Sequence, residues 1–356
     1  MKKLRVGILG ATGMVGQRYI DLLRDHPWFA VSVVFASERS AGKSYKDAVR
    51  GRWYTGSDIP EKASDLIVKK VDEIDYAKEN CDFVFSALGS SVAKQVEEKY
   101  AKDLPVVSNA SSNRWTKDVP MLIPEINPEH INIISKQQNN HGFRKGFIVV
   151  KPNCSLQSYL TPLYALHKNF RIKKVIITTM QAVSGAGHPG VSCFDILDNI
   201  VPYISGEEEK TEEEPKKILG KIKGKEIVKD DSFEISAHCN RVPVIDGHMA
   251  CISVKFEKKP EKEKILEIWR NFRSIPQELS LPFAPKNPII YRKEHDRPQT
   301  RLDRNKDKGM AVVVGRLRDC KVFDYRFTAL SHNTIRGAAG GGILNAELLY
   351  KRGYLK

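Results

Sequence analysis

The N-terminal segment constrains the fold more than any other part of the chain. A short apolar run over residues 4–10, LRVGILG, leads into glycines spaced G-x-x-G-x-x-G at Gly10, Gly13 and Gly16. Residues 14–26 then place apolar side chains on one helical face. Glycines let the backbone approach a phosphate, and a helix N-terminus offers free N–H groups. The segment predicts a strand, turn and helix that bind a dinucleotide; a purely structural glycine turn is the alternative.

Strands and helices alternate after this unit. Apolar runs over 29–37, 67–71, 81–88 and 104–110 predict strands, and residues 91–102 predict a helix with a charged outer face. This alternation is typical of a parallel sheet with helices on both faces. We therefore expect an α/β fold whose dinucleotide-binding domain spans residues 1–150.

The rest of the chain has longer strands and fewer helices. Residues 173–185 and 248–259 are β-prone, and residues 311–330 suggest an antiparallel pair of strands. These runs predict an α+β domain with a mostly antiparallel sheet over residues 151–332. The highly charged stretch 207–231 predicts a solvated surface helix and loop. A glycine-preceded helix is expected near the C-terminus, over residues 340–355.

The end of the second predicted strand indicates which cofactor binds. An NAD site usually has an acid there to hold the ribose hydroxyls. This chain has Ser37, Arg39 and Ser40, which suit a 2′-phosphate because Arg and Ser donate hydrogen bonds to phosphate oxygens. Glu38 fits this interpretation if its side chain points outward. The segment favours NADP over NAD.

A cysteine and a histidine are candidates for the chemistry. Cys154 follows the β run FIVV (147–150) and precedes an apolar segment. A thiol near a helix N-terminus has a lowered pKa, so we expect a reactive thiolate here; a buried structural cysteine is the alternative. His248 is a candidate acid/base partner, because histidine transfers protons near neutral pH, although a lone histidine is often structural.

Composition excludes several other classes of protein. The 356 residues carry 58 Lys+Arg against 43 Asp+Glu, a net charge of +15, but the charges are interleaved and no nucleic-acid-binding module occurs. Apolar runs are too short to span a membrane. The six cysteines are scattered, which indicates reduced thiols in the cytoplasm and neither a disulfide scaffold nor a metal site.

Seven motifs occur in order along nearly the whole chain. They are GILGATGMVG (7–16), SALGS (86–90), SNASSNR (108–114), PNCS (152–155), QAVSGAG (181–187), CNRVPVIDGH (239–248) and NTIRGAAGG (333–341). With these motifs in this order, the chain resembles the aspartate-β-semialdehyde dehydrogenase family, particularly its archaeal and fungal branch. The resemblance implies a Rossmann-like domain completed by residues 333–356, and a catalytic and dimerisation domain that forms a homodimer or homotetramer.

The resemblance also implies a role for each matching residue. Cys154 would be the nucleophile, His248 the general acid/base, and Gln181 would position the substrate and the acyl intermediate. Arg241 would bind the substrate carboxylate, Arg114 and Lys210 the phosphate, and Glu207 the substrate ammonium. The Glu-x-x-Lys pattern at 207–210 recurs at 214–217, so the sequence leaves open which of the two pairs supplies the substrate-binding Glu and Lys. The implied cofactor residues are Gly10, Thr12, Gly13, Met14, Val15, Ser37, Arg39, Ser40, Ser86, Leu88, Gly89, Ser184, Gly187 and Asn333.

The implied reaction is NADPH-dependent reduction of L-aspartyl-β-phosphate to L-aspartate-β-semialdehyde and phosphate, in the biosynthesis of lysine, threonine, methionine and isoleucine. Thioester formation suits a cysteine because sulfur is both a nucleophile and a leaving group. A malonyl-CoA reductase of the same fold is an alternative, although Glu207 and Lys210 favour an amino-acid substrate. N-acetyl-glutamyl-phosphate reductase is a more distant relative. A non-catalytic NADP-binding redox sensor, with Cys154 as its oxidisable thiol, is the alternative from another class.

Overall fold

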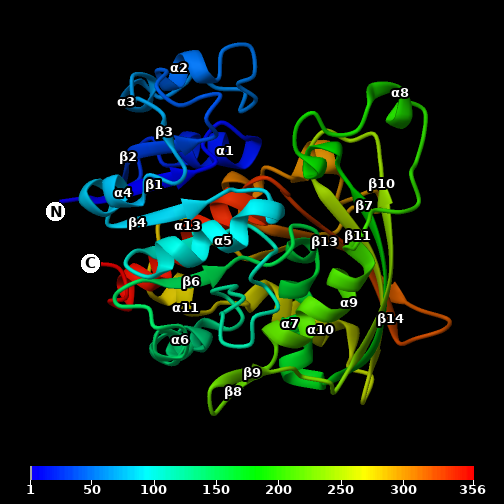
Figure 1. Ribbon diagram of the computed structural model, residues 1–356. Coiled ribbons are helices and arrows are strands. Elements are labelled where there is room, and N and C mark those ends of the chain that lie inside the picture. The colour runs from blue at the N-terminus through cyan, green and yellow to red at the C-terminus, as the bar shows by residue number, and fades with distance from the viewer. Residues whose placement is uncertain (1) are drawn as a thin grey trace.

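The computed structural model describes residues 2–356, which contain two six-stranded sheets and one two-stranded hairpin. The first sheet is built from the N-terminal part of the chain, and the second forms the opposite border of the molecule (Figure 1). The expected fold class, a Rossmann-like parallel sheet plus a mostly antiparallel sheet, is confirmed. The predicted boundary between residues 150 and 151 remains a prediction.

The first sheet is parallel throughout, with the strand order β3-β2-β1-β4-β5-β6 that is typical of dinucleotide-binding folds. Strands β4 to β6 are buried at every position, as expected where helices cover both faces. The bounds are β1 Leu4–Leu9, β2 Phe29–Ala36, β3 Lys69–Lys70, β4 Phe83–Ser86, β5 Pro105–Ser108 and β6 Phe147–Val150.

Helices and short turns connect these strands. Helix α1 ends four residues earlier than the predicted 14–26, and α5 matches its predicted span within one residue. The bounds are α1 Met14–Leu22, α2 Tyr45–Ala48, α3 Glu61–Ser64, α4 Ile74–Asn80, α5 Ser90–Ala101 and α6 Ile134–His141, with η1 Pro128–Ile133 before α6.

The second sheet has the order β10-β7-β11-β14-β13-β12. Its three central pairs are antiparallel and its two edge pairs parallel. Buried and exposed residues alternate along β7, β10 and β11, so one face packs on the core and the other is open. The bounds are β7 Ile172–Gln181, β10 Glu234–Arg241, β11 His248–Phe256, β12 Ile289–Arg292, β13 Val312–Asp319 and β14 Tyr325–Ser331, with the hairpin β8 Lys221–Lys223 and β9 Glu226–Val228.

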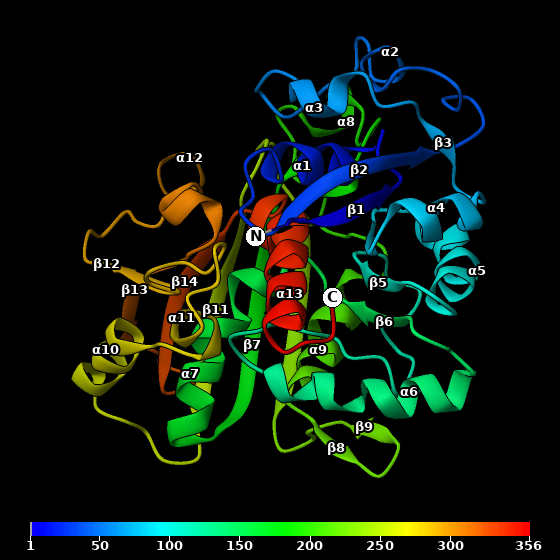
Figure 2. The same cartoon turned by 90° about the vertical axis from the view of Figure 1, so that its left-hand side faces the viewer.

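Helices α7, α9 and α10 lie on the inner face of this sheet (Figure 1). Helix α13 runs through the centre of the molecule and packs against α1 and β5 of the first half (Figure 2). The bounds are α7 Leu160–Phe170, α8 Cys193–Ile196, α9 Glu207–Ile218, α10 Lys262–Asn271, α11 Ile275–Glu278, α12 Thr300–Asp303 and α13 Gly340–Lys351. Short η segments are η2 Leu156–Ser158, η3 Val183–Ala186, η4 Lys306–Gly309 and η5 Ile335–Ala339.

One buried apolar cluster joins the two halves. It contains Val84 and Ile148 of the first sheet together with Ile252 of the second sheet and Trp269 of α10. This shared core packs the two sheets into one body. None of the described helices is long and apolar enough to cross a membrane.

The expectation of a solvated stretch over 207–231 is wrong for one face of α9. Glu207, Glu214 and Lys217 are each less than a tenth exposed. These charged residues are buried because each has a charged or polar partner, and such pairing offsets the cost of removing a charge from water. The charge pattern alone shows only polarity, so the burial could not be read from it.

Candidate active site

Strand register brings three of the predicted residues side by side. Gln181 ends β7 and Arg241 ends β10, and the two are paired across the parallel ladder. His248 begins β11, which runs antiparallel to β7, so it lies at the same end of the sheet. All three side chains are buried. The sequence motifs, separated by up to 67 residues (181 to 248), therefore meet at one edge of the second sheet.

Cys154 reaches this edge from the loop that follows β6 of the first sheet. Its Sγ lies 3.3 Å from His248 Nε2. The Ala182 backbone N–H donates to His248 Nδ1 at 3.0 Å. Because Nδ1 accepts this hydrogen bond, the neutral ring carries its proton on Nε2, facing the sulfur. Burial, followed by the charge of Arg241, lowers the pKa of His248 to about 3, which also favours the neutral ring.

The expectation of a lowered thiol pKa is wrong. Burial raises the pKa of Cys154, and the Glu207 carboxylate raises it further, against smaller lowering effects of Lys151, Arg114 and Arg241. The first regular helix after the thiol, α7, begins only at Leu160, and the intervening residues form a short 3₁₀ turn. These effects favour the protonated thiol, and a positive charge close to the sulfur would favour the thiolate.

Helix α9 contributes two carboxylates to the site. Glu207 accepts hydrogen bonds from Asn153 Nδ2 at 2.9 and 3.0 Å, from Gln181 Nε2 at 3.2 Å and from Lys210 Nζ at 2.9 Å. Glu214, two turns later, accepts from the Asn153 backbone N–H at 2.6 Å and from Arg114 Nη1 at 2.8 Å. The contact with Gln181 favours the Glu207–Lys210 register for the predicted substrate residues.

The two predicted arginines already have partners. Arg114 donates from Nε to the Lys151 carbonyl at 3.1 Å and from Nη2 to the Asn109 carbonyl at 3.1 Å, besides its pair with Glu214. Arg241 Nη1 donates to the Ala182 carbonyl at 2.8 Å. Burial lowers the pKa of Arg241, although a guanidinium stays charged in proteins. These contacts hold both cations at the edge of the site, beside Cys154.

The predicted glycine turn forms a cradle at the start of α1. Gly10 has φ +78°, and a Cβ there would lie 2.7 Å from the Ala87 carbonyl oxygen. A Cβ at Gly16 would lie 2.3 Å from the Gly10 oxygen, so glycine allows the helix to pack against the turn. Gly13 is the N-cap of α1, which has no side-chain cap and no acidic residue in its first turn. Such an N-terminus suits a pyrophosphate.

A cavity of about 230 Å³ extends from this cradle toward the Cys–His pair. Gly185 lines it, and a Cβ at that position would lie 3.0 Å from His248 Nε2. Asn333 Nδ2 donates to Ser184 Oγ at 2.8 Å, and Ser184 Oγ donates to Asp246 at 2.8 Å. The structure therefore brings the predicted nicotinamide-end residues together. The lining residues are Met14, Val15, Arg18, Tyr54, Thr55, Ser184, Gly185, Ala186, Gly187 and Thr334.

The remaining predicted cofactor residues lie along the same edge of the first sheet. Ser37 and Arg39 are exposed in the turn after β2, and Ser40 is buried. Glu38 pairs with Lys70 at 2.9 Å, as its expected outward orientation requires. The others are Ser86 at the end of β4, Leu88 and the exposed Gly89, which is the N-cap of α5, and Thr12, whose carbonyl accepts from Gln17 at 3.0 Å.

Several residues of the site were not predicted from the sequence. Asn153 and Lys151 precede the nucleophile by one and three residues, and this closeness to Cys154 in the sequence is the signal that could have indicated them. The sequence pattern offers Glu214 only as an alternative register of Glu207, whereas both carboxylates make hydrogen bonds in the site. Gly185 leaves room for His248, and the Ala182 backbone N–H orients that ring. A backbone donor has no side-chain signature.

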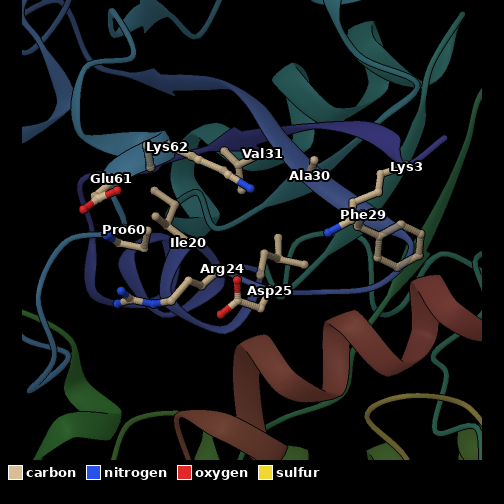
Figure 3. A pocket seen from close by; sticks show the side chains of 12 residues that line it. Lys3, Ile20, Arg24, Asp25, Phe29, Ala30, Val31, Pro60, Glu61 and Lys62 are labelled. Carbon is tan, nitrogen blue, oxygen red and sulfur yellow. The ribbon is translucent and has the colours of Figure 1, made fainter. Parts of the chain in front are cut away.

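Another pocket lies far from this chemistry, between α1, β2 and α3 (Figure 3). Its volume is about 360 Å³, and it mixes apolar side chains such as Ile20 and Phe29 with the charged Lys3, Arg24 and Lys62. None of the predicted site residues lines it. Size alone therefore does not identify the candidate site in this protein.

Comparison with known proteins agrees with this arrangement. Residues 5–134 match the family model described as semialdehyde dehydrogenase, NAD binding domain, and residues 160–336 match its dimerisation domain. The aspartate-semialdehyde dehydrogenases of Methanothermobacter thermautotrophicus and Schizosaccharomyces pombe are each 46% identical, covering 97% and 99% of this chain and 99% of each relative. The crystal structure of the Candida albicans enzyme with NADP is 43% identical with a TM-score of 0.90, over 99% of this chain and 100% of that one. The chain belongs to the aspartate-semialdehyde dehydrogenase family.

Proposed function

We propose that the chain is an NADP-dependent aspartate-semialdehyde dehydrogenase of the aspartate pathway of amino-acid biosynthesis. It would reduce L-aspartyl-β-phosphate to L-aspartate-β-semialdehyde with release of phosphate. The observation that carries the proposal is the placement of Cys154 Sγ, 3.3 Å from His248 Nε2, beside the buried Gln181 and Arg241. This set combines a nucleophile, a proton donor and a carboxylate-binding cation in one site.

NADP fits the cradle described above. The uncapped N-terminus of α1 would hold the pyrophosphate, and Arg39 with Ser37 and Ser40 would face the 2′-phosphate. The pairing of Glu38 with Lys70 supports this choice, because it directs the only acid of the turn toward a cation. Ser184 and Asn333 would hold the nicotinamide end. When bound, the reduced cofactor supplies a hydride.

The polar residues suit a substrate with an ammonium, a carboxylate and a phosphate. Glu207 would bind the ammonium, and Arg241 would bind the carboxylate through charge-assisted hydrogen bonds. Lys210 and Arg114 would bind the phosphate. Lys210 pairs with Glu207 at 2.9 Å, so substrate binding would exchange this contact for contacts to the substrate. Malonyl-CoA has no ammonium group, and Glu207 beside Gln181 therefore favours the aspartyl substrate.

The chain's own residues would perform the covalent steps. The Cys154 thiolate would attack the activated carbonyl, forming a C–S bond while the C–O bond to phosphate breaks. Gln181 would hold the resulting thioester. After reduction, the C–S bond breaks, the aldehyde forms and the thiolate returns. His248, with its proton on Nε2, would stabilise the oxygen of the reduced carbon by hydrogen bonding and serve as the predicted acid/base.

We further propose that the protein acts as a homodimer or homotetramer in the cytoplasm. The open face of the second sheet carries alternating exposed residues, including Ile176, which is 41% exposed in the middle of β7. The segment around α8 adds Phe194, Leu197 and Ile200, all more than half exposed. Exposed apolar patches of this kind commonly mark protein interfaces, and a second copy of the chain is the partner that the family model's dimerisation domain supports.

Trapping the acyl-enzyme tests the proposed chemistry. The purified protein is incubated with L-aspartate-β-semialdehyde and NADP without phosphate, and the intact mass is measured. We expect a mass gain of one aspartyl group that maps to the Cys154 peptide and disappears when phosphate is added. The Cys154→Ser variant should bind NADP and show no gain. A gain on any other cysteine, or turnover by the serine variant at a near-normal rate, would contradict the assignment.

A further inference from the structure

The guanidinium of Arg52, in the loop between α2 and α3, lies against the turn that follows β2. Its Nη2 donates to Ser40 Oγ at 3.4 Å. Nε and Nη2 also donate to the carbonyl of Ala48, the last residue of α2, at 3.1 and 2.7 Å. These contacts fix the plane of the guanidinium. Both hydrogens of Nη1 are left without an acceptor among residues 2–356.

The Ser40 hydroxyl has an unused hydrogen next to this guanidinium. The side chain is buried, and the Ser40 backbone N–H donates to the Ser37 carbonyl at 2.9 Å, which closes the turn. Because Ser40 Oγ accepts from Arg52, its own hydrogen is free to reach another acceptor. Two kinds of donor, a hydroxyl and a guanidinium, are therefore held side by side at this turn.

The acids close to this turn are already paired. Glu38 pairs with Lys70 at 2.9 Å, and Asp47 pairs with Arg50 at 2.6 Å. In the part of the chain that the structure describes, neither Arg39 nor Arg52 forms an ion pair, and the side chains of both are exposed. A phosphate monoester carries a charge between about −1.5 and −2 at pH 7. Two unpaired guanidinium groups match that charge.

Arg52 is also held in place relative to the glycine cradle. Gln17, a buried residue of α1, donates from Nε2 to the Thr12 carbonyl at 3.0 Å and to the Arg52 carbonyl at 2.8 Å. Its Oε1 accepts from the Tyr54 backbone N–H at 2.9 Å. One side chain thus joins the cradle to the backbone on either side of residue 53. A group fixed before binding loses less conformational entropy when the ligand arrives.

We propose that Arg52 is a specificity-determining residue for the cofactor: with Ser40, it binds the 2′-phosphate that distinguishes NADP from NAD. The inference rests on the proposed function, which places NADP in this cradle with Ser37, Arg39 and Ser40 at the 2′-phosphate. In this type of fold the adenosine ribose lies near the end of the second strand, and an arginine there accommodates a 2′-phosphate. Nη1 of Arg52 donates to the phosphate oxygens in charge-assisted hydrogen bonds, and the Ser40 hydroxyl donates beside it.

A purely structural role for Arg52 makes a different prediction. Basic side chains near the end of a helix commonly bind its last carbonyls, as Arg52 does with Ala48. Such a contact stabilises the loop whichever nucleotide is bound. A contact to the 2′-phosphate strengthens only the binding of nucleotides that carry this group. The two roles therefore differ in how they affect a matched pair of ligands.

Binding of nucleotide fragments separates the two roles without any turnover. Dissociation constants for adenosine 2′,5′-bisphosphate and 5′-AMP are measured by calorimetry on the wild type, Arg52→Gln and Arg52→Lys. Losing a hydrogen bond to a charged group should weaken bisphosphate binding by Arg52→Gln about tenfold. Binding of 5′-AMP should change less than about twofold. Arg52→Lys keeps the charge without the planar fork and should lie between. NADP and NAD are titrated in the same way, and the same difference is expected.

Arg50→Gln is the matched control. Arg50 is an exposed arginine two residues earlier that pairs with Asp47, and its variant should keep the wild-type constants. Wild-type affinity of Arg52→Gln for the bisphosphate would overturn the proposal, as would an equal loss of affinity for the bisphosphate and 5′-AMP. A wild-type protein that binds the bisphosphate no more tightly than 5′-AMP would instead contradict the NADP preference in the proposed function. The two failures are therefore distinguishable.

Discussion

At the scale of single residues, the side chains of the site are packed in direct contact with one another. His248 is held between the Ala182 N–H and the sulfur of Cys154, and Gly185 lies against the edge of its ring. The ring orientation is thus determined by a backbone donor and by the lack of a side chain. Neither feature is a reacting group, yet both decide where the Nε2 proton points.

Replacing Gly185 with Ala tests this packing. The added Cβ would lie 2.9 Å from Arg241 Nη1 and 3.0 Å from His248 Nε2, so both side chains must move. A displacement of about 1 Å in a catalytic group can lower a rate about 100-fold. We expect a loss of kcat of that order with little change in the thermal unfolding temperature. Activity within about twofold of wild type would show that this spacing does not control the site.

At the scale of elements, helix α9 ties the nucleophile loop to the second sheet. Its buried face carries Glu207, which accepts from the side-chain amide of Asn153, and Glu214, which accepts from the backbone N–H of Asn153. Its outer face carries residues such as Glu213, which pairs with Lys216 and Lys229. One stretch of acidic sequence therefore has two distinct functions, which depend on the helical face.

The variant Glu214→Ala, compared with Glu213→Ala, tests the difference between the buried and outer faces of α9. It leaves Arg114 buried without its carboxylate, and breaking a buried ion pair typically costs about 3–5 kcal/mol. We expect a loss of that size in the free energy of unfolding by denaturant, together with reduced activity. Glu213→Ala removes an acid from the partly exposed face and should change stability by less than about 1 kcal/mol. Equal effects of the two variants would contradict the assigned burial.

The contact between His130 of η1 and Gly220, just after α9, predicts how the free energy of unfolding depends on pH. His130 accepts from Asn127 at Nδ1 and donates from Nε2 to the Gly220 carbonyl, and burial lowers its pKa. Below about pH 6.5 the unfolded chain then binds a proton that the folded chain does not. The contribution of neutral His130 to the free energy of unfolding is therefore complete above that pH and is lost as pH falls. His130→Gln should reduce the slope of unfolding free energy against pH by up to about 1.4 kcal/mol per unit below that pH. An unchanged slope would mean that His130 is not held neutral.

The elements themselves were largely predictable from the sequence. Continuous apolar runs predicted β4, β5 and β6, and the glycine spacing predicted the turn before α1. The pKa of Cys154 and the burial of α9 were predicted wrongly. Both depend on desolvation by residues far away in sequence, which local pattern does not record. The proximity of Gln181, Arg241 and His248 likewise follows only from the strand order and register of the second sheet.

At the scale of the whole molecule, the second sheet has one face in the core and one open. The open face borders the same strands whose ends carry Gln181, Arg241 and His248. A second copy packed there would stabilise the strands that position the site. Oligomer formation and activity are then expected to be coupled.

The Ile176→Asp variant tests the proposed interface. A charge in the middle of β7 would oppose burial against a second copy, since an unpaired buried carboxylate is costly. We expect light scattering to show a smaller assembly and activity to fall with dilution. Ile67→Asp, at another exposed apolar position outside this sheet, should leave the mass unchanged. An unaltered mass for Ile176→Asp would place the interface elsewhere.

The central claim is that one site forms an acyl-cysteine and exchanges it with phosphate. The most direct measurement is reduction of NADP by the purified protein with L-aspartate-β-semialdehyde, followed by nicotinamide absorbance with and without phosphate. NAD in place of NADP, and malonyl-CoA with NADPH, are run in parallel. We predict turnover that requires phosphate and prefers NADP. Reduction of malonyl-CoA with no activity toward the semialdehyde would contradict the roles given to Glu207 and Lys210, and silence in every assay would contradict the proposed function.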